Sequence, residues 1–571
     1  MRLPAAMKRK DLLLCLVICF IVAAAFSPSL SNGFTNFDDT AYLTANPLVR
    51  SLAPANIKQI FTTTRPHTLF SPLVTLTFAL EYQLWELDPR GYHAVNLFLH
   101  ILNALLVFFL IRNVSRSPAT AFFTSLLFAI HPLRVESVAW VTERKDLLFT
   151  LFFLLALQCY IRYLKKDSGR DYLATLLLFA FAILAKISAL VLPAVLLLMD
   201  WKFESRISKK RWLEKIPFAV ILLLFAISSW NSVQAFSVQY SGQYSGGLHQ
   251  VIMKNSLWTI PFYLQKTIWP SRLSAHYPTD MRFFMPSLWF SIFYSIILIG
   301  GSFLLLKKFR REWLWGWGFF LIALLQVFGL VWHFFPVANR YSYLPAIGLS
   351  YILVMAVFLI SGKLARWKKL RSLWAVIAIS ALAYLGTASF ARCQVWKDSI
   401  SLWNDVIGKY PMIPLAYNNR AAALKAAGRL DEALADYSRA IRLMPHDGFY
   451  WNRGLARLQK NQAKEAMEDF YTAILKDQKH FQIFCQMMID THGRSGYEPI
   501  IEMGKRVLAT RPNSQIHIKM AETFISLRRW QEADFHLQEA VRLSPHTEEY
   551  RRALQVFREA LHLSRRRFEE K

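Results

Sequence analysis

The sequence is short of acidic side chains and of cysteine. It holds 38 Asp and Glu residues against 67 Lys and Arg residues, a formal net charge of +29, yet 54% of its residues are hydrophobic and 15% are aromatic. A basic face for nucleic acid is not indicated, because the cations stand between long apolar runs. The five cysteines are scattered and three lie within apolar runs, so they predict neither a disulfide framework nor a zinc site.

Several motifs of soluble enzymes are also missing. The chain has no Walker-type glycine loop, no GxSxG elbow, no HExxH pair and no paired CxxC sites. Nucleotide hydrolysis is therefore not indicated. A reaction that draws on an already activated membrane lipid remains open.

Apolar runs alternate with cationic connections over residues 1–392, which is typical of a polytopic membrane protein. Basic connections recur at every second loop, so the positive-inside tendency places the N-terminus in the cytoplasm. After an odd number of about eleven spans, the C-terminal part lies outside. We read the first run as an uncleaved span rather than a signal peptide, because further spans follow. The expected spans are 11–27, 93–111, 119–135, 147–164, 172–186, 187–200, 216–235, 286–306, 313–334, 344–361 and 372–391.

The rest of the chain is polar and repetitive. Small or aromatic residues return 33 residues later, close to the tetratricopeptide period. The recurring positions are Ala433, Tyr437 and Ala440, then Ala466, Phe470 and Ala473, then Ala533, Phe535 and Ala540. We predict an all-α chain, with a membrane domain over 1–392, a connecting segment over 393–413 and an α-solenoid of repeats over 414–571. The inner surface of such a solenoid usually holds protein or peptide.

Two adjacent carboxylates, Asp38 and Asp39, stand in FTNFDDTAY just after the first span. A carboxylate close to hydrocarbon is unfavourable unless it has a partner, water or a chemical role. The alternative is a solvated loop in which Asp39 and Thr40 cap a short helix. Local sequence leaves both interpretations open.

A second group of charges lies between the third and fourth expected spans, in HPLRVESVAWVTERKDLL. So dense a run beside the membrane is difficult to explain as packing, although Lys145 is expected to begin a helix and snorkel to the surface. Grouped Arg and Lys side chains there suit a lipid phosphate. The candidates are His131, Arg134, Glu136, Glu143, Arg144 and Asp146 in this run, with Lys186, His276, Tyr277, Arg340, Tyr341 and Tyr343 elsewhere at the same face.

Several segments, in order along nearly the whole chain, resemble one family. They are FDDTAYLTANPLV, SPLVTLTFALEY, DPRGYHAVNLFLH, FAIHPLRVESVAWVTERKDLLF, LAKISALVLP, YLQKTIWPSRLSAHYP, NRYSYLPAIG and VWKDSISLWNDVIGKYP. On these motifs the chain is similar to the transmembrane and tetratricopeptide repeat-containing O-mannosyltransferases and their bacterial relatives, which are polytopic glycosyltransferases of the GT-C class.

The resemblance implies an inverting transfer of mannose or a similar hexose from a polyprenyl-phosphate donor to Ser or Thr hydroxyls. The acceptor would be a secreted or envelope protein bound by the repeats at the outer membrane face. The family keeps an acidic pair in its first outer loop, which Asp38 and Asp39 match. Asp39 is then the expected general base, and Asp38 its orienting partner or a metal ligand.

The resemblance also assigns expected roles to the other charged groups. Arg144, Lys186 and Arg340 are expected to contact the donor phosphate. Acceptor or metal positioning is expected of His131, Glu136, Asp146, His276 and Tyr341. Clustered carboxylates also suit a divalent cation, Mg²⁺ or Mn²⁺, and the sequence leaves that choice open.

Two other functions compete with this interpretation. One is a catalytically silent membrane scaffold whose repeats recruit partners. The other is a transporter, which is less favoured because Lys186 is nearly the only ion inside an expected span. The lack of organelle signals and of obvious disulfides favours a bacterial inner membrane.

Overall fold

The computed structural model describes residues 9–63, 70–204, 207–240, 248–278, 288–305, 307–327, 337–364 and 367–569. The regular elements in these ranges are helices, which confirms the predicted all-α class. The chain divides into two compact units, Met1–Pro411 and Met412–Lys571. Most of the expected connecting segment, 393–413, therefore belongs to the first unit.

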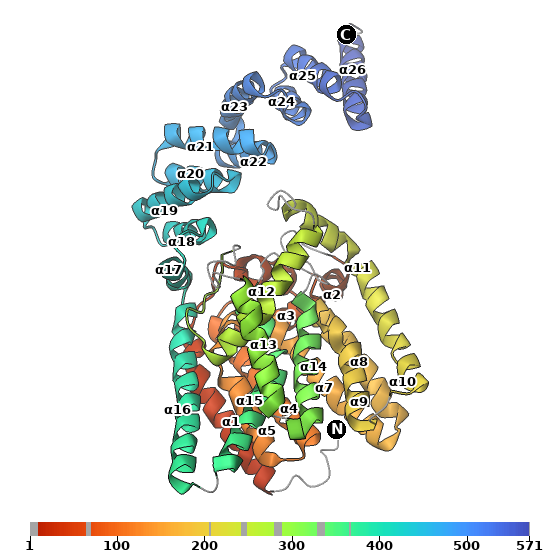
Figure 1. The fold of residues 1–571 in the computed structure, drawn as a ribbon. Coiled ribbons are helices and arrows are strands. Elements are labelled where there is room, and N and C mark those ends of the chain that lie inside the picture. The colour runs from red at the N-terminus through yellow and green to blue at the C-terminus, as the bar shows by residue number, and fades with distance from the viewer. Residues whose placement is uncertain are drawn as a thin grey trace. The chain divides into compact units, whose positions relative to one another are not determined.

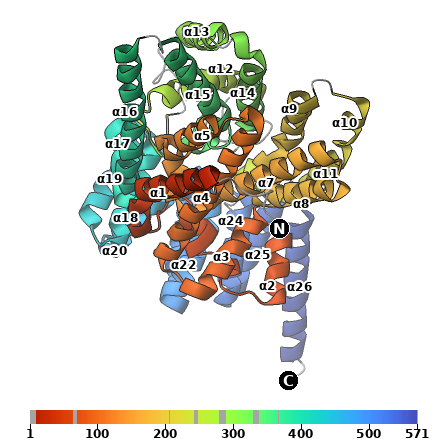
Figure 2. The same cartoon turned by 90° about the horizontal axis from the view of Figure 1, so that it is seen from below.

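The first unit is a bundle of helices in which α7 is central (Figures 1 and 2). Helix α7 packs against α4 and α8, while α1 packs against α4, α5 and α16. The long helices are α1 (Arg9–Phe26), α4 (Pro89–Ser115), α5 (Pro118–Ile130), α7 (Arg144–Lys166), α8 (Gly169–Ala185), α9 (Leu192–Glu204), α11 (Ile216–Tyr240), α12 (Leu248–Ile268), α13 (Leu288–Leu305), α14 (Arg310–Leu324), α15 (Ala346–Lys363) and α16 (Lys368–Cys393). Shorter helices are α2 (Pro54–Thr62), α3 (Pro72–Trp85), α6 (Val135–Ala139), α10 (Lys209–Leu213) and α17 (Ser399–Lys409).

Several of these helices can cross a membrane. Among the described residues, five helical stretches are long and apolar enough, and a sixth results if the bent pair Ser291–Leu305 and Lys307–Val327 is one span. Each of the expected spans overlaps a helix, but parts of 286–306 and 313–334 lie outside the described residues. Helix α5, with 13 residues, is only about 20 Å long, less than the roughly 30 Å of hydrocarbon. A multi-pass membrane protein is therefore confirmed, whereas the number of eleven spans stays a prediction.

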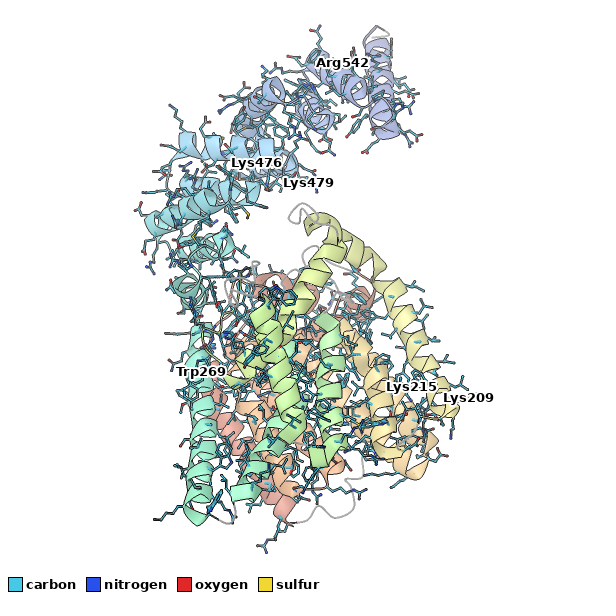
Figure 3. The ribbon with its side chains drawn as sticks, viewed as in Figure 1. Lys209, Lys215, Trp269, Lys476, Lys479 and Arg542 are labelled. Atoms are coloured by element: carbon cyan, nitrogen blue, oxygen red, sulfur yellow. The ribbon has the colours of Figure 1, made fainter. Side chains whose placement is uncertain are left out.

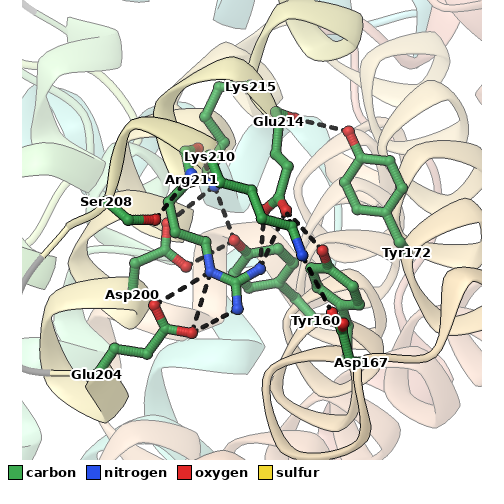
Figure 4. A network of polar contacts seen from close by, with 11 residues as sticks. Tyr160, Asp167, Tyr172, Asp200, Glu204, Ser208, Lys210, Arg211, Glu214 and Lys215 are labelled. Atoms are coloured by element: carbon green, nitrogen blue, oxygen red, sulfur yellow. Dashed lines mark hydrogen bonds and ion pairs between the residues drawn. The ribbon is translucent and has the colours of Figure 1, made fainter.

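The basic connection between α9 and α11 is neutralised largely by local acids (Figure 4). Lys215 donates from Nζ to Asp200 Oδ2 at 2.8 Å. Arg211, on α10, lies between Glu204 and Glu214, with Nη1 2.9 Å from Glu214 Oε2. Removing one partner of a buried ion pair is unfavourable, because it leaves an uncompensated charge. These ion pairs therefore hold α10 in place beside the segments on either side of it.

The second unit is a series of helix pairs. Its helices are α18 (Pro414–Ala426), α19 (Leu430–Leu443), α20 (Asp447–Gln459), α21 (Ala463–Lys476), α22 (Lys479–His492), α23 (Tyr497–Thr510), α24 (Ser514–Ser526), α25 (Trp530–Leu543) and α26 (Glu548–Glu569). The repeat positions at Tyr437 and Phe470 are fully buried, as the period predicts. Phe535, however, is 57% exposed, and Leu537 takes the buried position instead. The assignment of Phe535 is wrong because Leu537, not Phe535, stands four residues after Ala533, one helical turn along the buried face.

Polar pairs also recur within the repeats. Arg420 Nε donates to Asp436 Oδ2 at 2.6 Å, and 33 residues later Arg453 repeats this contact with Asp469, with Nε–Oδ2 at 2.9 Å. These pairs join the two helices of one repeat. The repetition of a contact, and not only of small residues, identifies α18–α19 and α20–α21 as equivalent units.

A histidine pair is buried between α24 and α25. His517 Nδ1 lies 2.8 Å from His536 Nδ1, and the ring of Phe524 stacks on His536 with centroids 5.3 Å apart. At this distance one ring must donate and the other accept, so the two imidazoles cannot both be protonated without losing the bond.

Candidate active site

The loop of residues 32–39 follows the first span and is fixed from two sides. Trp403 of α17 donates from Nε1 to Asn36 Oδ1 at 2.7 Å. The ring of Phe37 stacks on Trp140, with centroids 4.6 Å apart and planes at 11°. The chain is thus held in place directly before its two adjacent carboxylates.

Asp39 is 1% exposed, and both of its carboxylate oxygens are occupied. Oδ2 accepts from the backbone nitrogen of Thr35 at 2.7 Å and from its hydroxyl at 3.1 Å. Oδ1 accepts from the backbone nitrogen of Thr142 at 3.2 Å and from its hydroxyl at 2.9 Å. The side chain makes no cap bond to the helical turn Thr40–Thr44, so the helix-cap interpretation is wrong. Burial raises the pKa of Asp39 to about 6, against the lowering effect of these hydrogen bonds.

Asp38 has a different environment. Its side chain is 39% exposed, and Oδ2 lies 3.9 Å from Nζ of Lys145. Desolvation by the surrounding protein raises the pKa of the Asp38 carboxyl above its usual range, while the charges of Lys145 and Arg340 oppose this shift. An accessible carboxylate with a raised pKa is suited to accept a proton from a bound hydroxyl.

Lys145 connects Asp38 to a buried set of charges. The residue is 6% exposed, its Nζ lies 3.5 Å from Glu143 Oε1, and it stands 4.1 Å above the ring of Tyr42. The expectation that Lys145 snorkels is therefore wrong, because its ammonium turns inward. Arg340 continues the set, with Nε 3.7 Å from Glu143 Oε1 and Nη1 2.5 Å from Glu136 Oε1.

Lys186 joins the same set from another helix. Helix α8 ends at Ala185, and Lys186 takes an extended backbone before the chain resumes a helical path. Its Nζ lies 2.5 Å from Asp146 Oδ1 and 3.5 Å from Glu143 Oε2. The Ser137 hydroxyl donates to Asp146 Oδ2 at 3.0 Å. An ion in an apolar run requires a partner, and Lys186 has two.

The charges that these contacts connect form one group, which we call the Asp38 cluster. Three cations hold three buried carboxylates, and the fourth carboxylate, on Asp38, is the one with a large exposed fraction. The cluster consists of Asp38, Glu136, Glu143, Lys145, Asp146, Lys186 and Arg340.

Arg144 does not belong to this cluster. Its guanidinium is fully buried and forms an ion pair with Glu81 of α3. It also donates from Nε to Asn96 Oδ1 at 2.8 Å and from Nη2 to the carbonyl of Tyr92 at 2.7 Å. With its donors committed in this way, Arg144 joins α3 and α4 to α7, and the geometry does not favour the expected contact with a donor phosphate.

The three remaining residues with an expected role in acceptor or metal positioning differ in their surroundings. His131 uses both ring nitrogens: Nδ1 accepts from the backbone of Leu133 at 3.2 Å, and Nε2 lies 3.1 Å from the carbonyl of Thr267. This engagement leaves His131 no free nitrogen for an acceptor or a metal. His276 and Tyr341 lie near Arg340, whose guanidinium carbon is 5.0 Å from the Tyr341 ring centroid. Burial and then the charge of Arg340 lower the pKa of His276 to about 4, so it is neutral at physiological pH.

The donor set does not fit a resident divalent cation. Within the described ranges, no three His, Cys, Asp or Glu side chains are arranged to hold a metal ion. The buried carboxylates of the Asp38 cluster face ammonium and guanidinium groups, which occupy the positions that a cation would take. We therefore assign no step to Mg²⁺ or Mn²⁺.

Sequence reasoning misses the residues that decide the roles of the two aspartates. Thr35 and Thr142 bind Asp39, yet threonines in a loop carry no signal of their own. The charged run contains both Arg144 and Lys145, and nothing in it shows that Lys145 is the one beside Asp38. Which of the two cations reaches Asp38 depends on which side of α7 faces the loop of residues 32–39. The local sequence does not contain that information.

Comparisons with known proteins agree with this architecture. Residues 40–231 match a family model described as dolichyl-phosphate-mannose-protein mannosyltransferase, and residues 414–447 match the tetratricopeptide repeat. A protein O-mannosyl-transferase of Caenorhabditis elegans is 25% identical over 75% of this chain and 63% of its own length. The protein O-mannosyl-transferase TMTC1 of Homo sapiens is 25% identical over 77% of this chain and 56% of its own.

Shorter matches with higher identity also occur. The protein O-mannosyl-transferase TMTC3 of Homo sapiens is 33% identical over 26% of this chain and 16% of its own length. The chain thus spans only part of the length of these curated relatives. The predicted resemblance is confirmed: residues 40–231 are similar to the dolichyl-phosphate-mannose-protein mannosyltransferases, residues 414–447 are similar to the tetratricopeptide repeat, and the relatives named here are protein O-mannosyl-transferases.

Proposed function

We propose that the chain is a membrane glycosyltransferase. It transfers mannose or a similar hexose from a polyprenyl-phosphate donor to Ser or Thr hydroxyls of a secreted or envelope protein, with inversion. The observation that carries this proposal is the exposed carboxylate of Asp38, 3.9 Å from Lys145 at the edge of a buried charge cluster. The names of the relatives support the sugar and the acceptor class.

Asp38 rather than Asp39 is the proposed general base. The oxygens of Asp39 already accept four hydrogen bonds, so an incoming hydroxyl would have to displace a threonine. The Asp38 carboxylate has an accessible face and a raised pKa. This choice reverses the order expected from the sequence, in which Asp39 was the base.

The proposed reaction is a single displacement. The acceptor oxygen forms a bond to the anomeric carbon on the face opposite the phosphate, while the bond from that carbon to the phosphate oxygen breaks. The hydroxyl proton passes to Asp38, and the polyprenyl phosphate leaves as an anion without protonation. The sugar passes through an oxocarbenium-like state, in which a nearby carboxylate is favourable.

The cations of the cluster supply the electrostatic part. Lys145, Lys186 and Arg340 are held by carboxylates, so they do not have to reorganise when negative charge develops on the leaving phosphate. One well-placed donor of this kind is typically worth about 3–4 kcal/mol. Lys186 and Arg340 remain proposed to stabilise the phosphate through their charge, and Lys145 replaces Arg144 in this role.

The proposed topology rests on the alternation of basic connections along the chain. The N-terminus is cytoplasmic, while the Asp38 loop and the repeats face the outside of a bacterial inner membrane. Repeats of this kind hold protein or peptide along their inner surface, so the second unit would bind the acceptor protein.

The test is a transfer assay with the purified full chain, a polyprenyl-phosphate hexose and a Ser/Thr-rich protein acceptor. Asp38→Asn is expected to lower transfer by about 10²–10⁴-fold, the usual contribution of a general base. Asp167→Asn is the matched control, because Asp167 is an exposed carboxylate outside the cluster, at 71% side-chain exposure, in a left-handed backbone that Asn tolerates. Full transfer by both Asp38→Asn and Asp39→Asn would overturn the role of the acidic pair, and no transfer by the unaltered chain would favour the membrane scaffold.

A further inference from the structure

A second group of cations lies in the first unit, outside the Asp38 cluster. Arg392 lies in the last turn of α16 and Lys409 ends α17, and both form ion pairs with Asp405, at 2.6 and 2.5 Å. Lys266 and Arg272 come from the end of α12 and the segment after it. Lys266 feels the charges of Arg272 and Lys409, and Lys409 those of Arg392 and Arg272, so the four cations gather in one place.

These cations exceed the acids that face them. Among the described residues, Asp405 is the carboxylate paired with the group, which leaves three positive charges in excess. Burial and the neighbouring cations lower the pKa of Lys266 and of Lys409 to about 8 each. The Asp38 cluster has the opposite balance, since its three cations meet four carboxylates.

The donors of this group are incompletely used. Arg392 Nη1 donates to Asp405, but its Nη2 is buried without a hydrogen-bond partner in the described part of the chain. Arg272 donates from Nη2 to the carbonyl of Lys409 at 2.8 Å, and Lys266 from Nζ to the carbonyl of Ser271 at 2.8 Å. Because a buried guanidinium nitrogen without a partner is unfavourable, an added anion would complete this site.

The surroundings indicate the form of that anion. Helix α16 lies almost entirely on the outside of the unit, and its residues Ile379, Tyr384 and Phe390 are 64%, 53% and 43% exposed. Beside Lys266, Ile268 and Trp269 are 48% and 64% exposed, and Trp269 is labelled in Figure 3. A ligand with a long apolar chain along α16 would place its charged head at Arg392. This arrangement fits an amphiphile better than a free ion.

The site is on the same face of the bundle as Asp38. Gly33, at the start of the Asp38 loop, donates to the carbonyl of Lys397, five residues after Arg392. On the other side, Asn339, next to Arg340, donates to the carbonyl of Ser274 at 2.8 Å. The segment after α12 therefore runs from the cation group to the edge of the Asp38 cluster.

We propose that Lys266, Arg272, Arg392 and Lys409 bind the phosphate head of a membrane lipid, whose chain lies along α16. The site is separate from the proposed catalytic group. It does not require that the chain be a transferase. Its nearness to the Asp38 loop would hold a lipid phosphate at the membrane face where the sugar is transferred.

The test measures retention of radiolabelled polyprenyl monophosphate by the full chain in phosphatidylcholine nanodiscs. Arg272→Gln and Arg392→Gln are expected to weaken retention by about tenfold each, because each removes a charge-assisted hydrogen bond. Lys209→Gln is the matched control. Lys209 is an exposed cation on α10, and Figure 3 shows it far from Trp269, which lies beside the group. Asp38→Asn is expected to retain the lipid, which separates this site from the proposed reaction.

Two further arms identify the ligand. Phosphatidylglycerol in the nanodiscs that competes with the polyprenyl phosphate would support a general lipid-phosphate site. Inorganic phosphate that competes as well as either lipid would overturn the proposal of a lipid. Unchanged retention in both Arg272→Gln and Arg392→Gln would overturn the site itself. Arg272 is exposed, and its guanidinium contacts the carbonyl of Lys409 and the ring of Tyr410 rather than a carboxylate, so its variant leaves no unpaired acid and is expected to fold.

Discussion

The carboxylate of Asp38 lies 3.9 Å from the ammonium of Lys145, whereas both oxygens of the next residue, Asp39, accept hydrogen bonds from threonines. Adjacent residues of the same type therefore have different surroundings. The exposed one faces a cation and solvent, and the buried one joins the loop to the start of α7.

Asp39→Asn should lower stability more than it lowers the chemical step. An Asn amide would present a donor to one of the threonine N–H groups, which leaves hydrogen bonds unmade at a cost of about 1–3 kcal/mol. Thermal unfolding of the purified protein, with transfer measured on the folded fraction, checks this. A variant with the wild-type midpoint and no transfer would make Asp39 the base after all.

The rate of sugar transfer should rise with pH over an acidic range, which forms the acidic limb of the pH profile. The general base must be ionised, and the pKa of Asp38 is raised from its usual value of about 4, so the rise in activity should lie above that pH. The dependence of kcat/KM on pH measures it. Asp38→Glu is expected to keep part of the activity with a shifted limb. A profile without an acidic limb in both proteins would contradict the assignment.

Arg144→Met should prevent stable folding, because it leaves Glu81 buried without its partner. Breaking a buried ion pair typically costs about 3–5 kcal/mol. The double variant Arg144→Met, Glu81→Leu should recover much of the loss, since neither charge is then buried alone. The yield of folded protein and its unfolding midpoint report both effects. If Arg144→Met folded normally and raised only the KM for the donor, Arg144 would be a phosphate contact.

The repeats should lose stability in acid at α24 and α25. Burial and then the charge of His517 lower the pKa of His536 to about 4. The unfolded chain then binds more protons than the folded one between about pH 6.5 and 4, so stability is complete above pH 6.5 and falls as the pH approaches 4. Hydrogen exchange of the full chain at neutral and acidic pH measures this loss. His536→Gln should show a weaker pH dependence; an equal one would exclude the histidine pair as its cause.

An impermeant thiol reagent should label the repeats in intact cells. Lys479 and Arg542 are exposed positions of the second unit, and Lys209 is an exposed position on α10, all labelled in Figure 3. In a background without the native cysteines, Lys479→Cys and Arg542→Cys should be labelled, and Lys209→Cys should be protected until the membrane is opened. The reverse pattern would show that the number of spans is even or that the orientation is inverted.

Much of the fold follows from patterns that local physics fixes. Apolar runs and their basic connections predict the membrane helices, and the 33-residue spacing predicts the repeats. The burial of Tyr437 and Phe470 agrees with that spacing. Phe535 is exposed, because the buried position of that repeat is the residue one helical turn after Ala533, which is Leu537.

The sequence predicts which segments form the site more accurately than it predicts the role of each residue. Asp38, Glu136, Asp146, Lys186 and Arg340 meet in one cluster, although they come from separate segments. Arg144 and Lys145 were exchanged because neighbours on a helix point about 100° apart, and the rotation of α7 is set by its packing against α4 and α8. No pattern within the run itself contains that rotation.

The contact between Trp403 and Asn36 has a consequence for the choice of acceptor. Trp403 lies on α17, which ends at Lys409, and the repeat unit begins at Met412. A protein held by the repeats, as proposed, would be linked through the chain to α17, which contacts the Asp38 loop. Such a tether raises the effective concentration of every hydroxyl within reach, so acceptor choice would depend on recruitment more than on the sequence around each hydroxyl.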